Sequence, residues 1–379
     1  MKKYRIGIIG YGGFGKFLNY WWDQLAHVEV VAISDSRYSG DHHEKYKVYT
    51  DWKLLLQADD IDIVSIVTPP SYHAEMACAA MLAGKHVLLE KPIATTNEDA
   101  QMILDVAKAT GKSITVDHML RYNPIIKAFG EISKNNDLGP LRHVEVSNYA
   151  QDNSLDPGHW FWKEHKSGGI FIEHGVHFFD IVNSLTDQKC VEVKGTSHHR
   201  NEGQRDQVAA ITKYDQGLMA SHYHAFSGPG YFESTTIRLI FDLAKVEIEG
   251  WIPLNGKISA LVNEDSIKVL EALPGWHAEK MDPIDGLTDI SRPEGWGDVE
   301  EETTPLKTFV YGLAYDVQQM VSGTFKIPET KSAIYGACLQ NIIKDLIHNI
   351  ENPAHDMRIT AEDAQESLRI AIEASNIED

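Results

Sequence analysis

The sequence predicts two domains. The first is an α/β domain with a doubly wound parallel sheet, and the second is an α+β domain on an open, largely antiparallel sheet with helices on one face. The chain has 379 residues, more than one core usually supports. Apolar runs alternate with helical patterns over residues 1–122, as in βαβ units. From about residue 141, longer runs alternate polar and apolar residues, as in a sheet with one covered face. We therefore expect domains at 1–122 and 123–379, and the last helices could pack back on the first domain.

The composition limits the kinds of molecule that this protein is expected to bind. A net charge of −20 argues against nucleic acid and anionic membranes, because both attract basic surfaces. No apolar run approaches the roughly 20 residues that span a bilayer, and the first residues lack a signal-peptide cleavage pattern. Three scattered cysteines indicate reduced thiols. We expect a cytoplasmic protein that acts on a small molecule.

The first strand candidate, residues 5–9, leads into a glycine-rich turn and then a helix. The turn consists of Gly10, Tyr11, Gly12, Gly13, Phe14 and Gly15. This G-x-G-x-x-G pattern between strand and helix is typical of dinucleotide binding, because it permits a tight turn, a close approach to pyrophosphate and close helix packing. The helix N-terminus would add free N–H groups for the phosphates. A turn without a ligand is the alternative, since the motif alone is weak.

The second strand candidate, 28–34, ends in an acidic residue, Asp35, about 20 residues after Gly15. A carboxylate there would accept hydrogen bonds from an adenosine ribose and repel a 2′-phosphate, so NAD is favoured. Arg37 could hold that phosphate, so NADP stays open. A turn or helix-cap aspartate is the alternative for Asp35.

The third strand candidate, 61–67, is a continuous apolar run that turns at Thr68, Pro69 and Pro70. A helix over 72–83 follows, and a second apolar run then ends on Glu90, Lys91 and Pro92. The proline fixes the backbone and stops the strand. Lys91 is therefore predicted at a defined place at the carboxyl end of a parallel strand, where such sheets bind ligands.

These residues resemble the Gfo/Idh/MocA oxidoreductases, the relatives of glucose–fructose oxidoreductase and inositol dehydrogenase. The resemblance rests on the glycine motif, on Thr68-Pro69-Pro70-x-x-His73, and above all on the run from Gly84 to Pro92. The segment 118–124 is similar to the family's link between its two domains. The resemblance implies a Rossmann domain for NAD(P), with cofactor contacts from Gly10, Tyr11, Gly12, Gly13, Phe14, Gly15, Asp35, Arg37, Thr68, Pro69, Pro70, His73, Glu90, Lys91 and Pro92.

A second stretch, 160–180, resembles the family's other signature, a tryptophan before a glycine pair and then acid-x-Gly-x-His-x-x-Asp on a helix. Glu173 and His177 are four residues apart, so they share one helical face. His174 is expected on a different face as a structural residue. The family usually has Asp where this chain has Glu173, and the longer side chain changes the local geometry but not the carboxylate chemistry.

The two signatures together predict three catalytic residues. His177 would be the general base for a hydroxyl proton, since imidazole titrates near neutral pH. Lys91 would donate to the same oxygen, and Glu173 would orient the imidazole or bind a neighbouring hydroxyl. If each residue is considered alone, the ordinary alternative is a solvated side chain for Lys91 and a core residue for His177. The predicted substrate residues are His177, Arg121, Tyr122, Trp160 and Trp162.

Alternatives stay open for those substrate residues. Arg121 and Tyr122 would line the crevice or brace the domain junction, and the two tryptophans would stack on a sugar or belong to the core. His222 and His224 could bind a metal on one face of a strand, but no third ligand is evident, so no metal is predicted.

The pattern of polar and apolar residues in the rest of the sequence predicts strands at 191–197, 207–214, 218–226, 234–241 and 245–252. It predicts helices at about 305–321, 331–350 and 361–374. In the resembled family such a sheet carries the substrate site, and its open face makes the subunit contact. A homodimer or homotetramer is therefore expected. The segment 274–305 has poor periodicity and predicts a solvated loop, or alternatively a lid or subunit-contact loop.

The function expected from this sequence is NAD(P)-dependent hydride transfer at a secondary hydroxyl of a sugar, sugar derivative or cyclic polyol. One alternative is a redox-neutral enzyme on the same scaffold that cleaves a glycoside while recycling NAD. Another is a nucleotide-sensing regulator without turnover, against which Lys91 and His177 argue. No motif identifies the sugar, the carbon or the direction.

Overall fold

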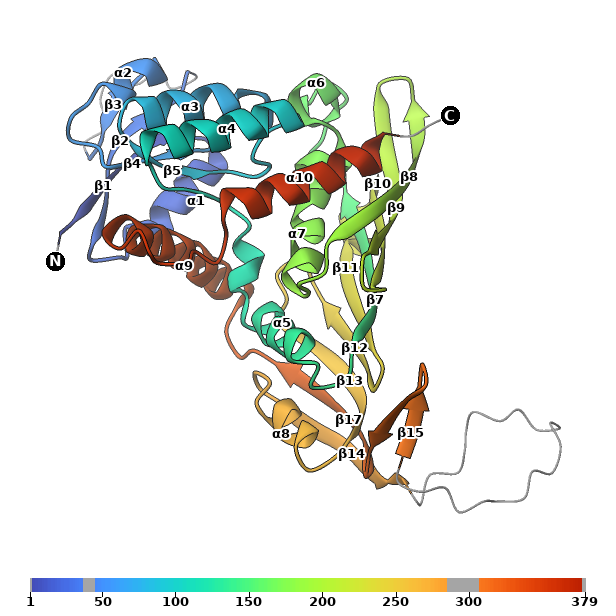
Figure 1. Cartoon of the computed structure of the whole chain (residues 1–379). Coiled ribbons are helices and arrows are strands. Elements are labelled where there is room, and N and C mark those ends of the chain that lie inside the picture. The colour runs from blue at the N-terminus through green and yellow to red at the C-terminus, as the bar shows by residue number, and fades with distance from the viewer. Residues whose placement is uncertain (1, 37–44, 285–306, 377–379) are drawn as a thin grey trace, which may run out of the picture.

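The computed structural model describes residues 2–36, 45–284 and 307–376, which form two large sheets with helices packed on each (Figure 1). The first sheet has six parallel strands in the order β3-β2-β1-β4-β5-β6. The order reverses between β1 and β4, where a doubly wound sheet binds its ligand. The predicted doubly wound fold is thereby confirmed. Its elements are β1 (Tyr4–Ile9), α1 (Gly13–Trp22), β2 (Val28–Ser34), β3 (Lys47–Tyr49), α2 (Trp52–Leu56), β4 (Ile63–Ile66), α3 (His73–Leu82), β5 (His86–Leu89), α4 (Asn97–Thr110) and β6 (Ile114–Val116).

The second sheet has nine strands in the order β14-β17-β13-β12-β11-β7-β10-β9-β8. Every pair is antiparallel except β7 with β10, so the sheet is largely antiparallel, as predicted. The five strands expected between residues 190 and 252 are β8 to β12. The strands are β7 (Leu141–Gln151), β8 (Cys190–Asn201), β9 (Gln204–Tyr214), β10 (Met219–Gly228), β11 (Ser234–Phe241), β12 (Ala244–Glu249), β13 (Asn255–Val262), β14 (His277–Pro283) and β17 (Gln319–Lys326).

The helix predicted over 305–321 is wrong. The described part of that stretch is a two-stranded sheet of β15 (Lys307–Val310) and β16 (Leu313–Asp316), followed by β17. In β17 a buried residue alternates with a partly exposed one through Val321, Gly323 and Phe325, the period of a strand. The glycine also disfavours a helix. The loop predicted over 274–305 begins with β14 instead, and its remainder, 285–306, lies outside the described residues.

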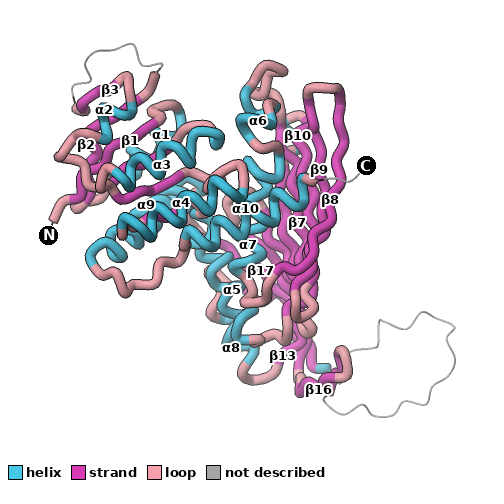
Figure 2. Tube along the Cα trace, turned by 45° about the horizontal axis from the view of Figure 1, so that its top comes forward, coloured by secondary structure: helices cyan, strands magenta, loops and turns pink. Residues whose placement is uncertain are grey.

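Helices cover one face of the nine-stranded sheet. The linking segment runs through a 3₁₀ turn (Met119–Tyr122) into α5 (Pro124–Asn135), and α7 (Val176–Ser184) and α10 (Ala361–Ser375) also pack on this side (Figure 2). The other long helix, α9 (Lys331–Glu351), packs against α1, where the indole of Trp22 donates to the Leu339 carbonyl at 3.2 Å.

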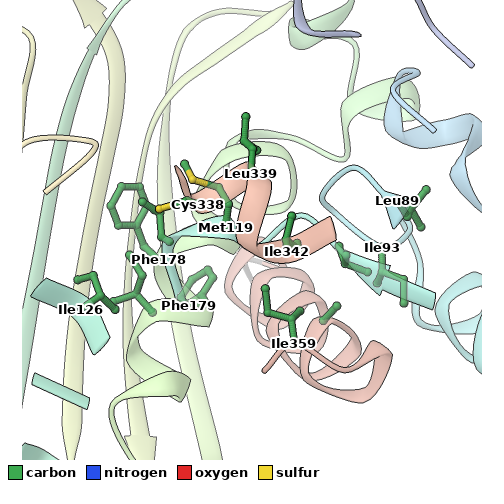
Figure 3. Close-up of a cluster of buried hydrophobic side chains, with 14 of the residues drawn as sticks. Leu89, Ile93, Met119, Ile126, Phe178, Phe179, Cys338, Leu339, Ile342 and Ile359 are labelled. Atoms are coloured by element: carbon green, nitrogen blue, oxygen red, sulfur yellow. The ribbon is translucent and has the colours of Figure 1, made fainter. Parts of the chain in front are cut away.

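The hydrophobic core continues from one sheet to the other. Leu89 and Ile93 from the first domain belong to the same buried cluster as Met119, Phe178 and Leu339 (Figure 3). The two halves are therefore held together by apolar burial, which fixes the cleft that they share. Within the described segments, no helix combines the length and the hydropathy that a bilayer crossing requires.

Candidate active site

The glycine-rich turn leaves the N-terminus of α1 open to an anion. Gly10 has a φ of 94°, and a Cβ there would lie 2.2 Å from the Val67 carbonyl oxygen. A Cβ on Gly15 would lie 2.3 Å from the Gly10 carbonyl oxygen, so both positions require glycine. A Cβ on Gly13 would meet nothing within 4 Å. No side chain caps the helix at Gly12, and its first turn carries no acid, so the turn fits a pyrophosphate.

A cavity of about 960 Å³ extends from this turn into the second domain. On the first-domain side it is lined by the carboxyl ends of β1, β2, β4, β5 and β6. On the second-domain side it is lined by the segment that leads into α7, by Phe226 of β10 and by Trp251, which follows β12. The residues that line it include Gly10, Gly12, Asp35, Thr68, Glu90, Lys91, Asp117, Trp160, Glu173, His174, His177, Phe226, Trp251 and Tyr335.

Lys91 joins the two domains across this cavity. Its Nζ lies 2.7 Å from Glu173 Oε1 and 2.7 Å from the Glu173 carbonyl oxygen, and it donates to both. Both side chains are largely buried, at 15% and 16% exposed. The bond between Lys91 and Pro92 is cis. The two hydrogen bonds to Glu173 hold the ammonium group at one point between the glycine-rich turn and the second domain.

A π-helical turn, Phe171–Gly175, leads directly into α7; the turn brings two side chains to the cavity and α7 brings a third. A π turn holds more residues than an α-helical turn, so successive side chains rotate less around the axis. Glu173 and His177 line the cavity together, as their spacing suggests, and so does His174, which was expected on a different face.

His177 is buried against aromatic rings. Its ring meets that of Trp251 edge to face at 4.8 Å, and its Nδ1 has no hydrogen-bond partner among the described residues. Burial, followed by the positive charge of Lys91, holds the pKa of His177 well below its ordinary value. The same two causes lower the pKa of His174 to about 3. Both imidazoles are therefore neutral at pH 7, and His177 can accept a proton.

Most of the predicted cofactor residues line this cavity, and three of the described ones do not. Tyr11 is turned into the core, where its hydroxyl accepts from Asn19 Nδ2 at 2.6 Å. His73 is buried behind the strand ends, with its two ring nitrogens 2.7 Å from the Pro92 carbonyl oxygen and 2.9 Å from that of Thr68. It positions the turn beside Lys91 without facing the cavity. Pro92 itself does not line the cavity, and Arg37 lies outside the described residues.

Three of the predicted substrate residues lie away from the cavity. The guanidinium of Arg121 contacts Asp180 at 2.8 Å and Asp363 at 3.0 Å. The Tyr122 hydroxyl donates to Asp345 at 2.5 Å. These contacts tie the linking segment to α7, α9 and α10, which favours the junction alternative. The indole of Trp162 donates to the Leu155 carbonyl at 3.1 Å and faces the core.

Several residues of the cavity were missed from the sequence. Trp251 follows Gly250 at the end of β12 and stacks on His174 with 5.2 Å between ring centroids. Tyr335 comes from α9, Asp117 follows β6 and Phe226 belongs to β10. Of these residues, only Asp117 could have been recognised from the sequence, because it is a polar residue directly after a buried strand. The other three depend on long-range packing.

His222 and His224 lie on the covered face of β10 and are fully buried. Their rings are 6.1 Å apart, and Phe179 and Phe171 of the helical segment pack on them. No cluster of three or more metal-binding side chains occurs in the described parts of the chain.

Comparison with known proteins agrees with this architecture. Residues 4–118 match the model of an oxidoreductase family with an NAD-binding Rossmann fold, and residues 126–245 match the Gfo/Idh/MocA C-terminal domain. The first match, together with the glycine-rich turn, places the chain among oxidoreductases with an NAD-binding Rossmann fold. The chain belongs to the Gfo/Idh/MocA oxidoreductase family.

Its relatives have diverse activities. The chain is 29% identical to the NAD-dependent scyllo-inositol 2-dehydrogenase of Bacillus subtilis over 43% of its own length and 48% of that protein. It is 29% identical to a glycosyl hydrolase family 109 protein of Shewanella, over 58% and 55% of the two chains. It therefore spans about half the length of these curated relatives. The crystal structure of myo-inositol 2-dehydrogenase from Lactobacillus plantarum superposes with a TM-score of 0.69 at 18% identity, covering 99% of this chain and 96% of that one.

Proposed function

We propose that this protein is an NAD(P)-dependent dehydrogenase that transfers hydride between nicotinamide and a secondary hydroxyl of an uncharged sugar or cyclic polyol. The observation that carries the proposal is the ion pair of Lys91 with Glu173, next to neutral His177, in the same cavity as the glycine-rich turn. A nucleotide-sensing regulator would need no such pair beside its ligand.

Each of these residues would have a separate role in the oxidation of one substrate hydroxyl. The turn at Gly10–Gly15 and Asp35 would hold NAD(P), which supplies the hydride acceptor when bound. His177 accepts the hydroxyl proton, because hydride leaves readily only from a carbon whose oxygen becomes negative. Lys91 donates a hydrogen bond to that oxygen, and Glu173 holds the Lys91 ammonium in place.

The walls of the second domain favour an uncharged ring. Trp160, Trp251 and Phe226 present aromatic surface, on which the apolar face of a sugar or polyol can stack. Among the described residues that line the cavity, Lys91 is the only lysine or arginine, and it is already paired with Glu173. A phosphate or carboxylate on the substrate would therefore lack a cationic partner. The relative that acts on scyllo-inositol is consistent with this class.

Asp35 favours NAD over NADP. It lines the cavity at the end of β2, the position from which a carboxylate binds the adenosine ribose and repels a 2′-phosphate. Either cofactor is compatible with the chemistry of Lys91 and His177.

Redox-neutral glycoside cleavage is the second candidate. It is favoured by the similarity to a glycosyl hydrolase family 109 protein and by two further carboxyl groups, Glu90 and Asp117, in the cavity wall. That reaction would consume the glycoside without accumulating reduced cofactor.

One assay separates the candidates. Purified protein is incubated with NAD or NADP and a panel of neutral sugars, inositols, glycosides, sugar phosphates and uronic acids. Reduced nicotinamide is followed by absorbance, and products are identified by chromatography. Net reduction together with a keto product from a neutral substrate is expected. Glycoside cleavage without net reduction would support the second candidate, and nucleotide binding without any turnover would support a regulator.

A further inference from the structure

Two carboxyl groups lie buried side by side in the first-domain wall of the cavity, and the reaction scheme above gives neither a role. Glu90 follows β5 and Asp117 follows β6, at the carboxyl ends of two paired parallel strands. Glu90 is 8% exposed and Asp117 is 2% exposed. Both residues line the cavity that contains Lys91 and the glycine-rich turn.

Glu90 and Asp117 directly follow Leu89 and Val116, which are paired neighbours in β5 and β6, so the two residues are adjacent across the sheet. Glu90 Oε1 and Asp117 Oδ1 are buried without a hydrogen-bond partner among the described residues. Burial raises the pKa of both groups, and the proximity of Asp117 raises the pKa of Glu90 further. Two adjacent carboxylates in a buried site repel each other, so the pair would share one proton and carry one negative charge.

That charge is not balanced by its neighbours. The nearby Lys91 ammonium is already paired with Glu173 at 2.7 Å. Burial lowers the pKa values of His118, His174 and His177, so all three imidazoles are neutral at pH 7. The lysine end of the cavity therefore has a net negative charge of about one unit before any ligand binds.

We propose that Glu90 and Asp117 together act as a single-charge counterion for the cofactor. The pair's one negative charge would offset the positive charge of the nicotinamide ring before hydride transfer and that of the His177 imidazolium after it. This inference rests on the proposed function.

The charges balance through the reaction. The alcohol carbon loses hydride to the nicotinamide ring, whose positive charge disappears with the two electrons. The hydroxyl proton moves to His177, whose positive charge appears at the same time, and the substrate becomes a neutral ketone. One buried negative charge thus matches one positive charge both before and after hydride transfer, as long as cofactor and substrate are bound.

The test compares the dissociation constants of NAD⁺ and NADH without substrate, by calorimetry or fluorescence, in wild type, Glu90→Gln, Asp117→Asn and the double variant. Each single variant removes one carboxyl of a pair that holds one charge, so the remaining carboxylate retains that charge. We expect each single variant to keep the NADH-to-NAD⁺ ratio of dissociation constants within about threefold of wild type. The double variant removes the charge and should lower that ratio by about tenfold or more.

A matched control neutralises Glu264 and Asp265, which are exposed and lie outside the cavity, and should leave the ratio unchanged. An unaltered ratio in the Glu90→Gln/Asp117→Asn double variant would overturn the counterion role. A single variant that shifts the ratio as far as the double variant would place the whole charge on that one residue and overturn the shared proton.

Infrared difference spectroscopy keeps the test decisive if the double variant does not fold. Wild type without ligand should show the C=O band of a protonated buried carboxyl at neutral pH, and each single variant should lack it. Absence of that band from wild type would overturn the shared proton. If wild type binds neither NAD⁺ nor NADH, the proposed function is wrong, and the counterion role falls with it. If wild type binds both but turns over no substrate, the ratio of dissociation constants still tests the counterion role.

Discussion

Residues of two domains hold Lys91 in place at the cavity. Its ammonium donates to two oxygens of Glu173, while the turn that precedes it is braced by His73 between the carbonyls of Thr68 and Pro92. We expect Lys91→Ala to lower kcat by about 100- to 1,000-fold, the usual cost of removing one donor to a developing oxyanion. The affinity for NAD should change only a few-fold. Steady-state kinetics and nucleotide titration measure both effects, and Lys127→Ala on the exposed face of α5 is the control. Ordinary turnover in Lys91→Ala would remove the lysine from the mechanism.

His177 should set the acid limb of the pH profile. The base must be neutral to accept a proton, so activity falls as pH drops through its pKa. Because burial and Lys91 hold that pKa well below 6.5, kcat/KM should stay flat from about pH 8 to pH 6 and decline only in more acidic solution. His177→Ala should lower kcat by roughly 100- to 10,000-fold and abolish this limb. A limb centred near pH 6.5, or one that survives the substitution, would identify another base.

The elements of the first domain were largely predictable from the sequence, and those at the end of the second sheet were not. Strands such as β4 are buried on both faces and read as unbroken apolar runs. The sequence of β17 contains serine, glycine and threonine, and its identity as a strand depends on its neighbours β13 and β14. Lys91, Glu173 and His177 lie in local motifs, so their shared cavity was foreseeable. Trp251 and Tyr335 reach it only through tertiary packing.

Two buried histidines of β10 predict that the free energy of unfolding decreases in acid. His222 and His224 are buried with no partners for their ring nitrogens among the described residues, and burial holds their pKa values well below 6.5. The unfolded chain binds protons at these residues below about pH 6.5 and the folded chain does not, so stability falls as pH falls through this range. Each histidine contributes a slope of up to about 1.4 kcal/mol per pH unit.

Replacing both histidines by leucine should therefore reduce the loss of unfolding free energy between pH 6.5 and pH 5, measured by urea denaturation at each pH. His277→Leu replaces an exposed histidine of β14 and should leave the slope as in wild type. An unchanged slope in the double leucine variant would mean that acid sensitivity has another source.

At the scale of the whole molecule, one face of the nine-stranded sheet is covered by no helix of the described residues (Figure 1). Ile211 of β9, Met219 of β10 and Tyr149 of β7 are exposed apolar residues of this sheet, at 52%, 44% and 49%. We propose this face as the subunit contact of a homo-oligomer, since exposed apolar surface of this kind marks interfaces. Ile211→Arg should shift the mass measured by light scattering toward the monomer. Leu82→Arg, an exposed position on α3, should not. A monomeric wild type would contradict the proposal.

The central claim is direct hydride transfer from a substrate carbon to the cofactor, and deuterium labelling tests it most directly. The protein is incubated with NAD and an inositol or sugar that is deuterated at its ring carbons, and both cofactor and product are analysed by mass spectrometry. The account predicts one deuterium in the reduced cofactor for each molecule of ketone formed. Two results would contradict the account: a glycoside is cleaved while no deuterated reduced cofactor accumulates, or the substrate stays intact and no deuterium reaches the cofactor.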